Sequence, residues 1–166
     1  LNMARPREMR RAPVALDALI ENTLSFVSEK LKLRGIAVQA ELGPVPSVVG
    51  DAERLQQLFL NLFLNAVDAM PEGGTLRVQL DTEADGEVVV RIADTGQGIP
   101  PEDLARIFDP FFTSKAAGQG NGLGLTVAKG IAGDHGGALS VESAVGIGTE
   151  FRVRLPSAGR IPVPSG

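Results

Sequence analysis

The run of residues 55–70, with the sequence LQQLFLNLFLNAVDAM, most constrains what this chain can fold into. Within this largely apolar run, Asn61, Asn65 and Asp68 recur at the spacing i, i+4 and i+7. That spacing places the three side chains on one face of an α-helix whose remaining surface is apolar. Because a buried polar group is costly unless it is paired, the stripe needs partners. It either bonds neighbouring backbone or forms the floor of a polar ligand site, and the helix alone leaves both alternatives open.

Residues on both sides set the ends of this central helix. Asp51 is a good N-cap, and Pro71 with the glycine pair that follows it stops the helix near Met70. The same apolar spacing predicts further helical segments at residues 17–33, 101–108 and 123–134.

Alternation of apolar and polar residues predicts the strands. It is present at residues 36–42, 75–81, 87–93, 138–144 and 148–155, and a short edge strand is expected at residues 48–49. Asp85 and Gly86 form a hairpin signal, so the strands on either side of them should pair antiparallel. The sequence therefore predicts an α+β fold: a two-layer sandwich with a mixed, mostly antiparallel sheet covered on one face by about three helices.

The chain has a length suited to one domain with a proper core. Residues 1–13 are rich in Arg and lack periodicity, so we expect a lead-in from an upstream dimerisation hairpin or linker. Residues 14–156 are expected to form the domain itself. Residues 157–166, rich in Pro and Gly, are expected to be a flexible tail.

Composition excludes several classes of function. Lys and Arg number 16 against 20 Asp and Glu, a net charge of −4 that argues against nucleic acid as partner. The absence of cysteine excludes disulfides and thiol chemistry, and the single histidine, His135, excludes a multi-histidine metal cluster. No apolar stretch approaches the ~18 residues needed to span a bilayer, and no signal-peptide pattern is present. We therefore expect a cytoplasmic domain, whose parent protein can still be membrane-anchored elsewhere.

The first candidate for chemistry is the segment Asp94-x-Gly96-x-Gly98, which directly follows a predicted strand. Glycines allow the backbone to approach a ligand closely. A carboxylate at the strand end can accept a hydrogen bond from an exocyclic amine such as that of adenine. The alternative is an Asx turn, in which Asp94 bonds its own loop backbone.

The second candidate is residues 118–125, GQGNGLGL, which open the helix predicted at 123–134. The free N–H groups and the positive dipole end of a helix N-terminus predict a phosphate cradle, with a flexible linker as the alternative. Lys115 lies just before this segment and is either a phosphate contact or a surface lysine. Asn65 then gains a plausible task, because Mg²⁺ bridging phosphates takes oxygen ligands and needs only one or two from the protein.

The long loop at 111–122 includes the start of the second candidate, and a segment of this length without periodicity is typical of a functional loop. Phe108, Phe111 and Phe112 lie at its start. They either latch a mobile lid onto the body of the domain or belong to an ordinary core.

In this order, the motifs resemble the ATP-binding catalytic domain of bacterial sensor histidine kinases. That domain shares a superfamily with DNA gyrase, the Hsp90 chaperones and MutL-type repair ATPases. The resemblance covers roughly residues 16–156. The Ala-Arg-Pro-Arg-Glu run near the start resembles the junction that leaves the dimerisation hairpin in the nitrogen-regulation type of sensor kinase. The family resemblance implies the Bergerat fold with a long ATP lid. Its motifs are the N box (61–69), the G1 box (94–98), the F box (108–112), the G2 box (120–125) and the last-strand motif (146–149).

The resemblance also implies roles for individual residues. Asn65 would ligate Mg²⁺ while Asn61 assists at the phosphates, Lys115 would reach the γ-phosphate, and Asp94 would bind the adenine amine with support from Thr149. The implied ATP-binding set also contains Asp68, Gly96, Gly98, Ile99, Gly120, Asn121, Gly122, Leu123, Gly124 and Leu125. Two positions depart from the pattern. The G2 box commonly has Thr or Ser in place of Asn121, and many relatives carry a basic or amide residue in place of Asp68.

Position 61 distinguishes kinases from hydrolases. The resemblance implies that hydrolytic members carry a Glu four residues before the Mg²⁺-binding Asn, as the general base that activates water. This chain has Asn61 there, and an amide cannot take a proton at neutral pH. His135, in Asp-His-Gly-Gly at a helix end, is interpreted as a C-terminal cap and not as a phosphoacceptor.

We therefore expect a fragment that binds ATP and Mg²⁺ and delivers the γ-phosphate to a histidine on a separate dimerisation domain upstream. A response regulator is the second expected partner. The isolated domain is expected to be a monomer and the full-length protein a homodimer. The alternatives are a superfamily ATPase and a non-catalytic adenine-nucleotide-binding module.

Overall fold

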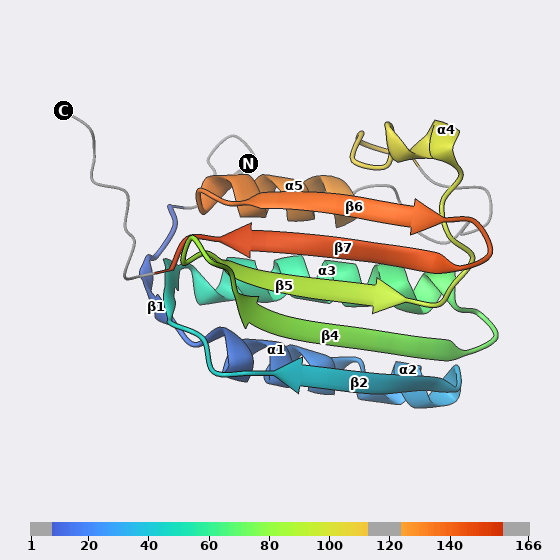
Figure 1. The fold of residues 1–166 in the computed structure, drawn as a ribbon, viewed down its shortest axis with the longest axis horizontal. Helices are drawn as coiled ribbons and strands as arrows, with labels where there is room; N and C mark the ends of the chain where they lie inside the picture. The colour runs from blue at the N-terminus through green and yellow to red at the C-terminus, as the bar shows by residue number, and fades with distance from the viewer. Residues whose placement is uncertain (1–7, 113–123, 158–166) are drawn as a thin grey trace, which may run out of the picture.

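The computed structural model describes residues 8–112 and 124–157. A five-stranded sheet forms one layer, and helices α1, α3 and α5 cover one of its faces (Figure 1). The elements in chain order are β1 (Ala12–Val14), α1 (Leu16–Phe26), α2 (Ser28–Leu33), β2 (Ile36–Leu42), β3 (Val48–Gly50), α3 (Ala52–Ala69), β4 (Gly74–Thr82), β5 (Val88–Asp94), α4 (Pro101–Leu104), α5 (Gly124–Asp134), β6 (Ala138–Ala144) and β7 (Gly148–Leu155).

The sheet has the strand order β2-β4-β5-β7-β6. Strand β2 runs parallel to β4, and every other neighbouring pair in this sheet is antiparallel. Asp85 and Gly86 lie in the connection between β4 and β5, where Gly86 has φ +89° and the backbone N–H of Glu87 donates to the Asp85 carboxylate. The predicted α+β two-layer sandwich with a mixed, mostly antiparallel sheet is confirmed.

Helix α3 lies at the centre of the helical layer, and its ends are where the sequence predicted them. The Asp51 carboxylate accepts bonds from the backbone N–H groups of Glu53 and Arg54, so it caps the helix as expected. The helix ends at Ala69, next to Met70. Its apolar residues pack between the sheet and the neighbouring helices, and its fully buried members are Leu55, Leu58, Phe59, Leu62, Phe63, Ala66 and Val67.

The single helix predicted at 17–33 is wrong, because the chain breaks into α1 and α2 at Val27 (φ −106°, ψ 6°). On each side of the break a serine hydroxyl donates to a backbone carbonyl three residues earlier: Ser25 to Asn22 and Ser28 to Ser25. Such local bonds compete with the helical ladder, which explains an interruption that apolar spacing does not reveal.

Within the segment expected to be a lead-in, Ala12 begins β1, which pairs antiparallel with β3. The backbone N–H of Arg10 donates to the Asp51 carboxylate (3.0 Å). The guanidinium of Arg11 donates to the carbonyl of Asp134 at the end of α5 (3.0 Å). Residues entering the domain are therefore bound to the N-terminus of α3 and the C-terminus of α5. At the other end of the described residues, Ser157 is buried.

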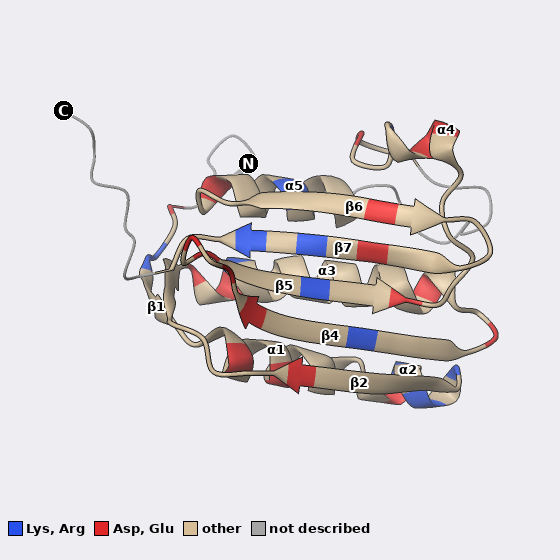
Figure 2. Ribbon diagram, viewed as in Figure 1, with Lys and Arg blue, Asp and Glu red and all other residues tan. Residues whose placement is uncertain are grey.

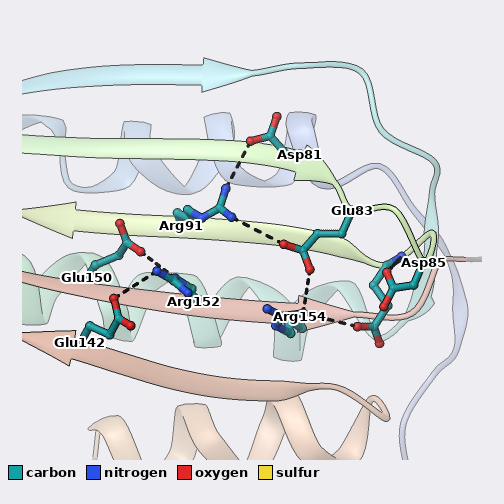
Figure 3. A network of polar contacts seen from close by, with 9 residues as sticks. Asp81, Glu83, Asp85, Arg91, Glu142, Glu150, Arg152 and Arg154 are labelled. Carbon is teal, nitrogen blue, oxygen red and sulfur yellow. Dashed lines mark hydrogen bonds and ion pairs between the residues drawn. The ribbon is translucent and has the colours of Figure 1, made fainter.

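The face of the sheet that the helices leave open carries both acidic and basic residues on neighbouring strands (Figure 2). Arg91 bridges Asp81 and Glu83, Arg154 contacts Glu83 at 2.7 Å, and Arg152 contacts Glu150 at 2.7 Å and Glu142 at 3.1 Å (Figure 3). Partly exposed ion pairs contribute little stability each. The aliphatic parts of the arginine side chains nevertheless shield apolar surface. Val89 points to this open face, between two core residues of β5, and is fully buried.

Across residues 8–112 and 124–157, none of the helices combines the length and apolar character required of a bilayer span.

Candidate functional site

Asp94, at the end of β5, is the buried acidic residue of the site, with 7% of its surface exposed. It follows Val88, Val90 and Ile92 on the helix-covered face of the sheet, and strand alternation fixes that direction. The backbone N–H of Gly96 donates to its Oδ1 (2.9 Å). Burial raises the pKa of Asp94, while backbone hydrogen bonds from Gly96 and Thr149 oppose the rise. The Asx turn considered as an alternative is therefore present, and the carboxylate still has acceptor sites to offer a ligand.

The loop after Asp94 lies tightly against the end of α3. A Cβ at Gly96 would overlap the carbonyl oxygen of Ala69, so only glycine fits there. The neighbouring Gln97 N–H donates to the same carbonyl (3.2 Å). Gly98 has φ +78°, a left-handed conformation that favours glycine. The two glycines thus serve a close approach to α3 and a turn, both directly after Asp94.

The polar stripe of α3 connects two parts of the site. At one end, the Asn61 amide donates from Nδ2 to the carbonyl of Gly124, the first residue of α5 (3.0 Å). At the other end, the Ala69 carbonyl holds the loop of Gln97. Residues 61, 65 and 69 share one row at four-residue spacing, so Asn65 lies between the two contacts. Asn61, Asn65 and Asp68 are all half-buried. Asn61 therefore bonds neighbouring backbone, the first alternative considered for the stripe.

Three phenylalanines at the edge of the site have different environments. Phe108 packs edge-on against Phe151 (centroids 6.5 Å apart), and its carbonyl accepts a bond from the Thr126 hydroxyl of α5 (2.8 Å). Phe112 stacks under the guanidinium of Arg106 (4.7 Å). Phe111 is 74% exposed and has φ +66°. Phe108 and Phe112 thus pack against the body of the domain, and Phe111 faces solvent.

Several predicted site residues lie outside the described part of the chain. These are Lys115, Gly118, Gly120, Asn121, Gly122 and Leu123. Gly124 and Leu125 are described and form the first turn of α5.

Sequence reasoning missed one residue of the site, Ser143 on β6. Its hydroxyl accepts from the backbone N–H of Ile99 (2.8 Å) and lies 2.8 Å from the Thr149 hydroxyl. A signal was present, because Ser143 continues the core-facing positions of Leu139 and Val141, where an apolar residue is expected. A polar residue at the end of such a row is a reason to look for a partner.

His135 is buried at the end of α5, away from the residues described above. Its Nδ1 lies 2.8 Å from the carbonyl of Ile131, and its Nε2 accepts from the backbone N–H of Asp51 (3.0 Å). Nδ1 is therefore the protonated nitrogen. The interpretation of His135 as a helix cap is confirmed, and the ring also joins α5 to the start of α3.

These contacts describe a site with acceptors at one end and a helix N-terminus at the other. Asp94 and Thr149 present oxygens from the sheet, which suits a ligand group that donates hydrogen bonds. The first turn of α5 presents its N-terminus beside Asn61, which suits an anion. The half-buried amide of Asn65 between them offers an oxygen of the type that Mg²⁺ prefers. Within the described residues no cluster of three or more His, Asp or Glu forms a metal site.

Comparison with known proteins relates this arrangement to a family. The model of the family described as histidine kinase-, DNA gyrase B-, and HSP90-like ATPase matches residues 50–159. Sensor histidine kinase ZraS of Klebsiella oxytoca is 38% identical over 161 residues, which cover 96% of this chain and 34% of ZraS. The chain thus spans about a third of the length of the curated relatives it matches first.

Solved structures show the same fold. Full-length ShkA in complex with AMPPNP has a TM-score of 0.81 and 32% identity, over 92% of this chain and 32% of ShkA. Histidine kinase ThkA in complex with response regulator protein TrrA has a TM-score of 0.79 and 27% identity, over 93% of this chain and 44% of that one.

Proposed function

The chain belongs to the histidine kinase-, DNA gyrase B- and HSP90-like ATPase family, and from that premise we propose that it is the ATP-binding catalytic domain of a sensor histidine kinase. The domain delivers the γ-phosphate of ATP to a histidine on a dimerisation domain of the same protein. The phosphoryl group then passes to a response regulator. The similarity to ZraS, ShkA and the ThkA–TrrA complex supports this proposal.

The buried carboxylate of Asp94 is the observation that carries the proposal. A carboxylate that remains buried at a strand end, with only backbone N–H partners described, is costly to the fold and therefore indicates a ligand. In the proposed complex it accepts from the adenine amine, with Thr149 beside it and Ile99 lining the same loop. Gly96 and Gly98 shape the loop that brings the base close to the carboxylate.

The phosphates lie at the opposite end of the site in this proposal. They meet the N-terminus of α5, with Gly124 and Leu125 in its first turn and residues 120–123 before it, and Lys115 reaches the γ-phosphate. Asn65 ligates Mg²⁺, which neutralises phosphate charge when bound. Asp68, next to Asn65 on the stripe, completes the polar wall.

Position 61 favours phosphotransfer over hydrolysis. The Asn61 side chain donates to the carbonyl of Gly124, and an amide in that position has no basic atom to take a proton from water. The γ-phosphate is thereby kept for the histidine acceptor. We propose residues 14–156 as this domain, with the dimerisation domain upstream of it and the full-length protein a homodimer.

Calorimetry of this chain with ATP, ADP and GTP, each with and without Mg²⁺, tests the proposal. We expect ATP and ADP to bind, GTP to bind at least tenfold more weakly, and Mg²⁺ to strengthen ATP more than ADP. Equal affinity for ATP and GTP, or no binding, would refute it. Steady phosphate release from ATP that disappears in Asn61→Ala would favour the ATPase alternative.

A further inference from the structure

Three polar side chains form a row across the sheet at the site. Asp94 of β5 pairs in register with Thr149 of β7, and Thr149 pairs with Ser143 of β6. Side chains directly opposite each other on neighbouring strands point to the same face. The row therefore continues the buried, helix-covered face formed by Ile92, Phe151 and the residues before them. Ser143 is the member of the row farthest from Asp94.

One arrangement of hydroxyl protons satisfies all three hydrogen bonds of the Ser143 side chain. A serine hydroxyl has one proton to donate and two lone pairs to accept with. The N–H of Ile99 takes one lone pair (2.8 Å). The carbonyl of Gly148 can only accept, so the Ser143 proton goes to it (3.0 Å). The remaining contact, to the Thr149 hydroxyl at 2.8 Å, then requires Thr149 to be the donor.

We propose that Ser143 is a positioning residue that sets nucleobase specificity by holding the Thr149 proton away from the ligand. With that proton directed to Ser143, the Thr149 hydroxyl offers only lone pairs beside the Asp94 carboxylate. The base end of the site is then acceptor-only. The two acceptors, the Asp94 carboxylate and the Thr149 oxygen, fit the 6-amino group of adenine, which donates. They repel the 6-oxo group of a hypoxanthine or guanine base, which accepts.

This inference rests on the proposed function, because it assigns Ser143 a part in ATP recognition. It also separates Ser143 from a purely structural role. Loss of the bond to Ile99 alone would loosen the loop and weaken 6-amino and 6-oxo nucleotides alike. Loss of the hydrogen bond from Thr149 to Ser143 changes the ratio of the two affinities, because the Thr149 hydroxyl can then rotate and donate to a 6-oxo group.

The test compares ATP with inosine triphosphate, which places a 6-oxo group where ATP has its 6-amino group. Calorimetry on the wild-type chain is expected to show ATP binding at least about tenfold more tightly. In Ser143→Ala the ratio of the two affinities is expected to fall about fivefold. Ser140→Ala, an exposed serine on the same strand, should leave the ratio unchanged.

A second variant shows whether Ser143 acts through Thr149. Thr149→Val removes the hydroxyl with little change in shape and should by itself lower the ratio of ATP affinity to inosine triphosphate affinity. This variant also tests the inference if Ser143→Ala does not fold. Adding Ser143→Ala to Thr149→Val should then change the ratio no further. An unchanged ratio in both single variants, or equal loss for the two nucleotides, would overturn the inference while leaving the proposed function standing. A wild-type chain that binds neither nucleotide overturns the proposed function and this inference with it.

Discussion

Asp94→Asn separates what the carboxylate does for a ligand from what it costs the fold. The substitution keeps the shape of the side chain and removes its charge. A hydrogen bond to a charged group is worth about 1.5–3 kcal/mol, and each 1.4 kcal/mol is tenfold in affinity, so we expect ATP to bind roughly 10- to 150-fold more weakly. Because Asp94 is proposed to contact the base, ADP and ATP should lose the same factor in calorimetry.

The effect of Asp94→Asn on the free energy of unfolding should have the opposite sign. Burial raises the pKa of Asp94 in the folded chain above its ordinary value of 3.8. The contribution of the protonated form to stability is therefore full below pH 3.8 and is lost as the pH rises through the raised folded value. At pH 7 the ionised carboxylate costs stability that the neutral amide does not. Without nucleotide, Asp94→Asn should be more stable than wild type at pH 7, with a gap that narrows as the pH falls.

Urea unfolding without nucleotide, at several pH values from about 4 to about 8, measures this gap from near the ordinary pKa of Asp94 upward. Asp81→Asn is the matched control, because it changes the net charge equally at a side chain that is 60% exposed on the open face of the sheet. Its effect should stay within about 1 kcal/mol. An Asp94→Asn variant that is less stable than wild type at pH 7, and that binds ATP as well as wild type, would refute the reasoning.

Two further substitutions probe the opposite ends of α5. Asn61→Asp replaces the donor to the Gly124 carbonyl with an acceptor, so unfolding in urea should require about 1–3 kcal/mol less and calorimetry should show weaker ATP binding. His135→Leu removes the bonds to Asp51 and Ile131, so the free energy of unfolding should fall by about 2 kcal/mol. Nucleotide affinity should change little in this second variant, because the 11-residue helix places His135 about 16 Å from Gly124. A loss of affinity as large as in Asn61→Asp would contradict this.

Local signals predicted most of the fold. The limits of α3 follow from the Asp51 cap and from Pro71, both of which act within a few residues of the helix end. The limits of β6 and β7 follow from alternation over seven or more residues. Strand β1 has three residues, too few for a period, and it forms only because Val48–Gly50 lies beside it. The break at Val27 depends on serine hydroxyls that compete with helical carbonyls, and apolar spacing does not contain that information.

The candidate site likewise contains residues that the sequence could identify and residues that it could not. Asp94 and the glycines after it could be selected from sequence, because a carboxylate followed by glycines at a strand end has a chemical meaning by itself. The contacts of Ser143 could not, although its place in a core-facing row marks it as unusual, because its bonds to Thr149 and Ile99 depend on the register of β6 with β7 and of β7 with β5. Strands β5 and β7 are neighbours in the sheet but far apart in the chain. Cross-strand register of this kind is set by tertiary structure, and no local spacing encodes it.

The polar stripe of α3 explains why the two ends of the site keep a fixed separation. Asn61 holds the first residue of α5, and Ala69 holds the loop after Asp94. The eight helical steps from Asn61 to Ala69 span about 12 Å of helix. The buried helix therefore sets the distance that a ligand must have between a donor group bound at Asp94 and anionic groups bound at α5. In the proposed complex, Asn65, midway along that length, is the position from which one side chain reaches Mg²⁺ between the two ends. The spacing of the stripe thus fixes the geometry of the proposed nucleotide site, and its polarity is the cost of that function to the core.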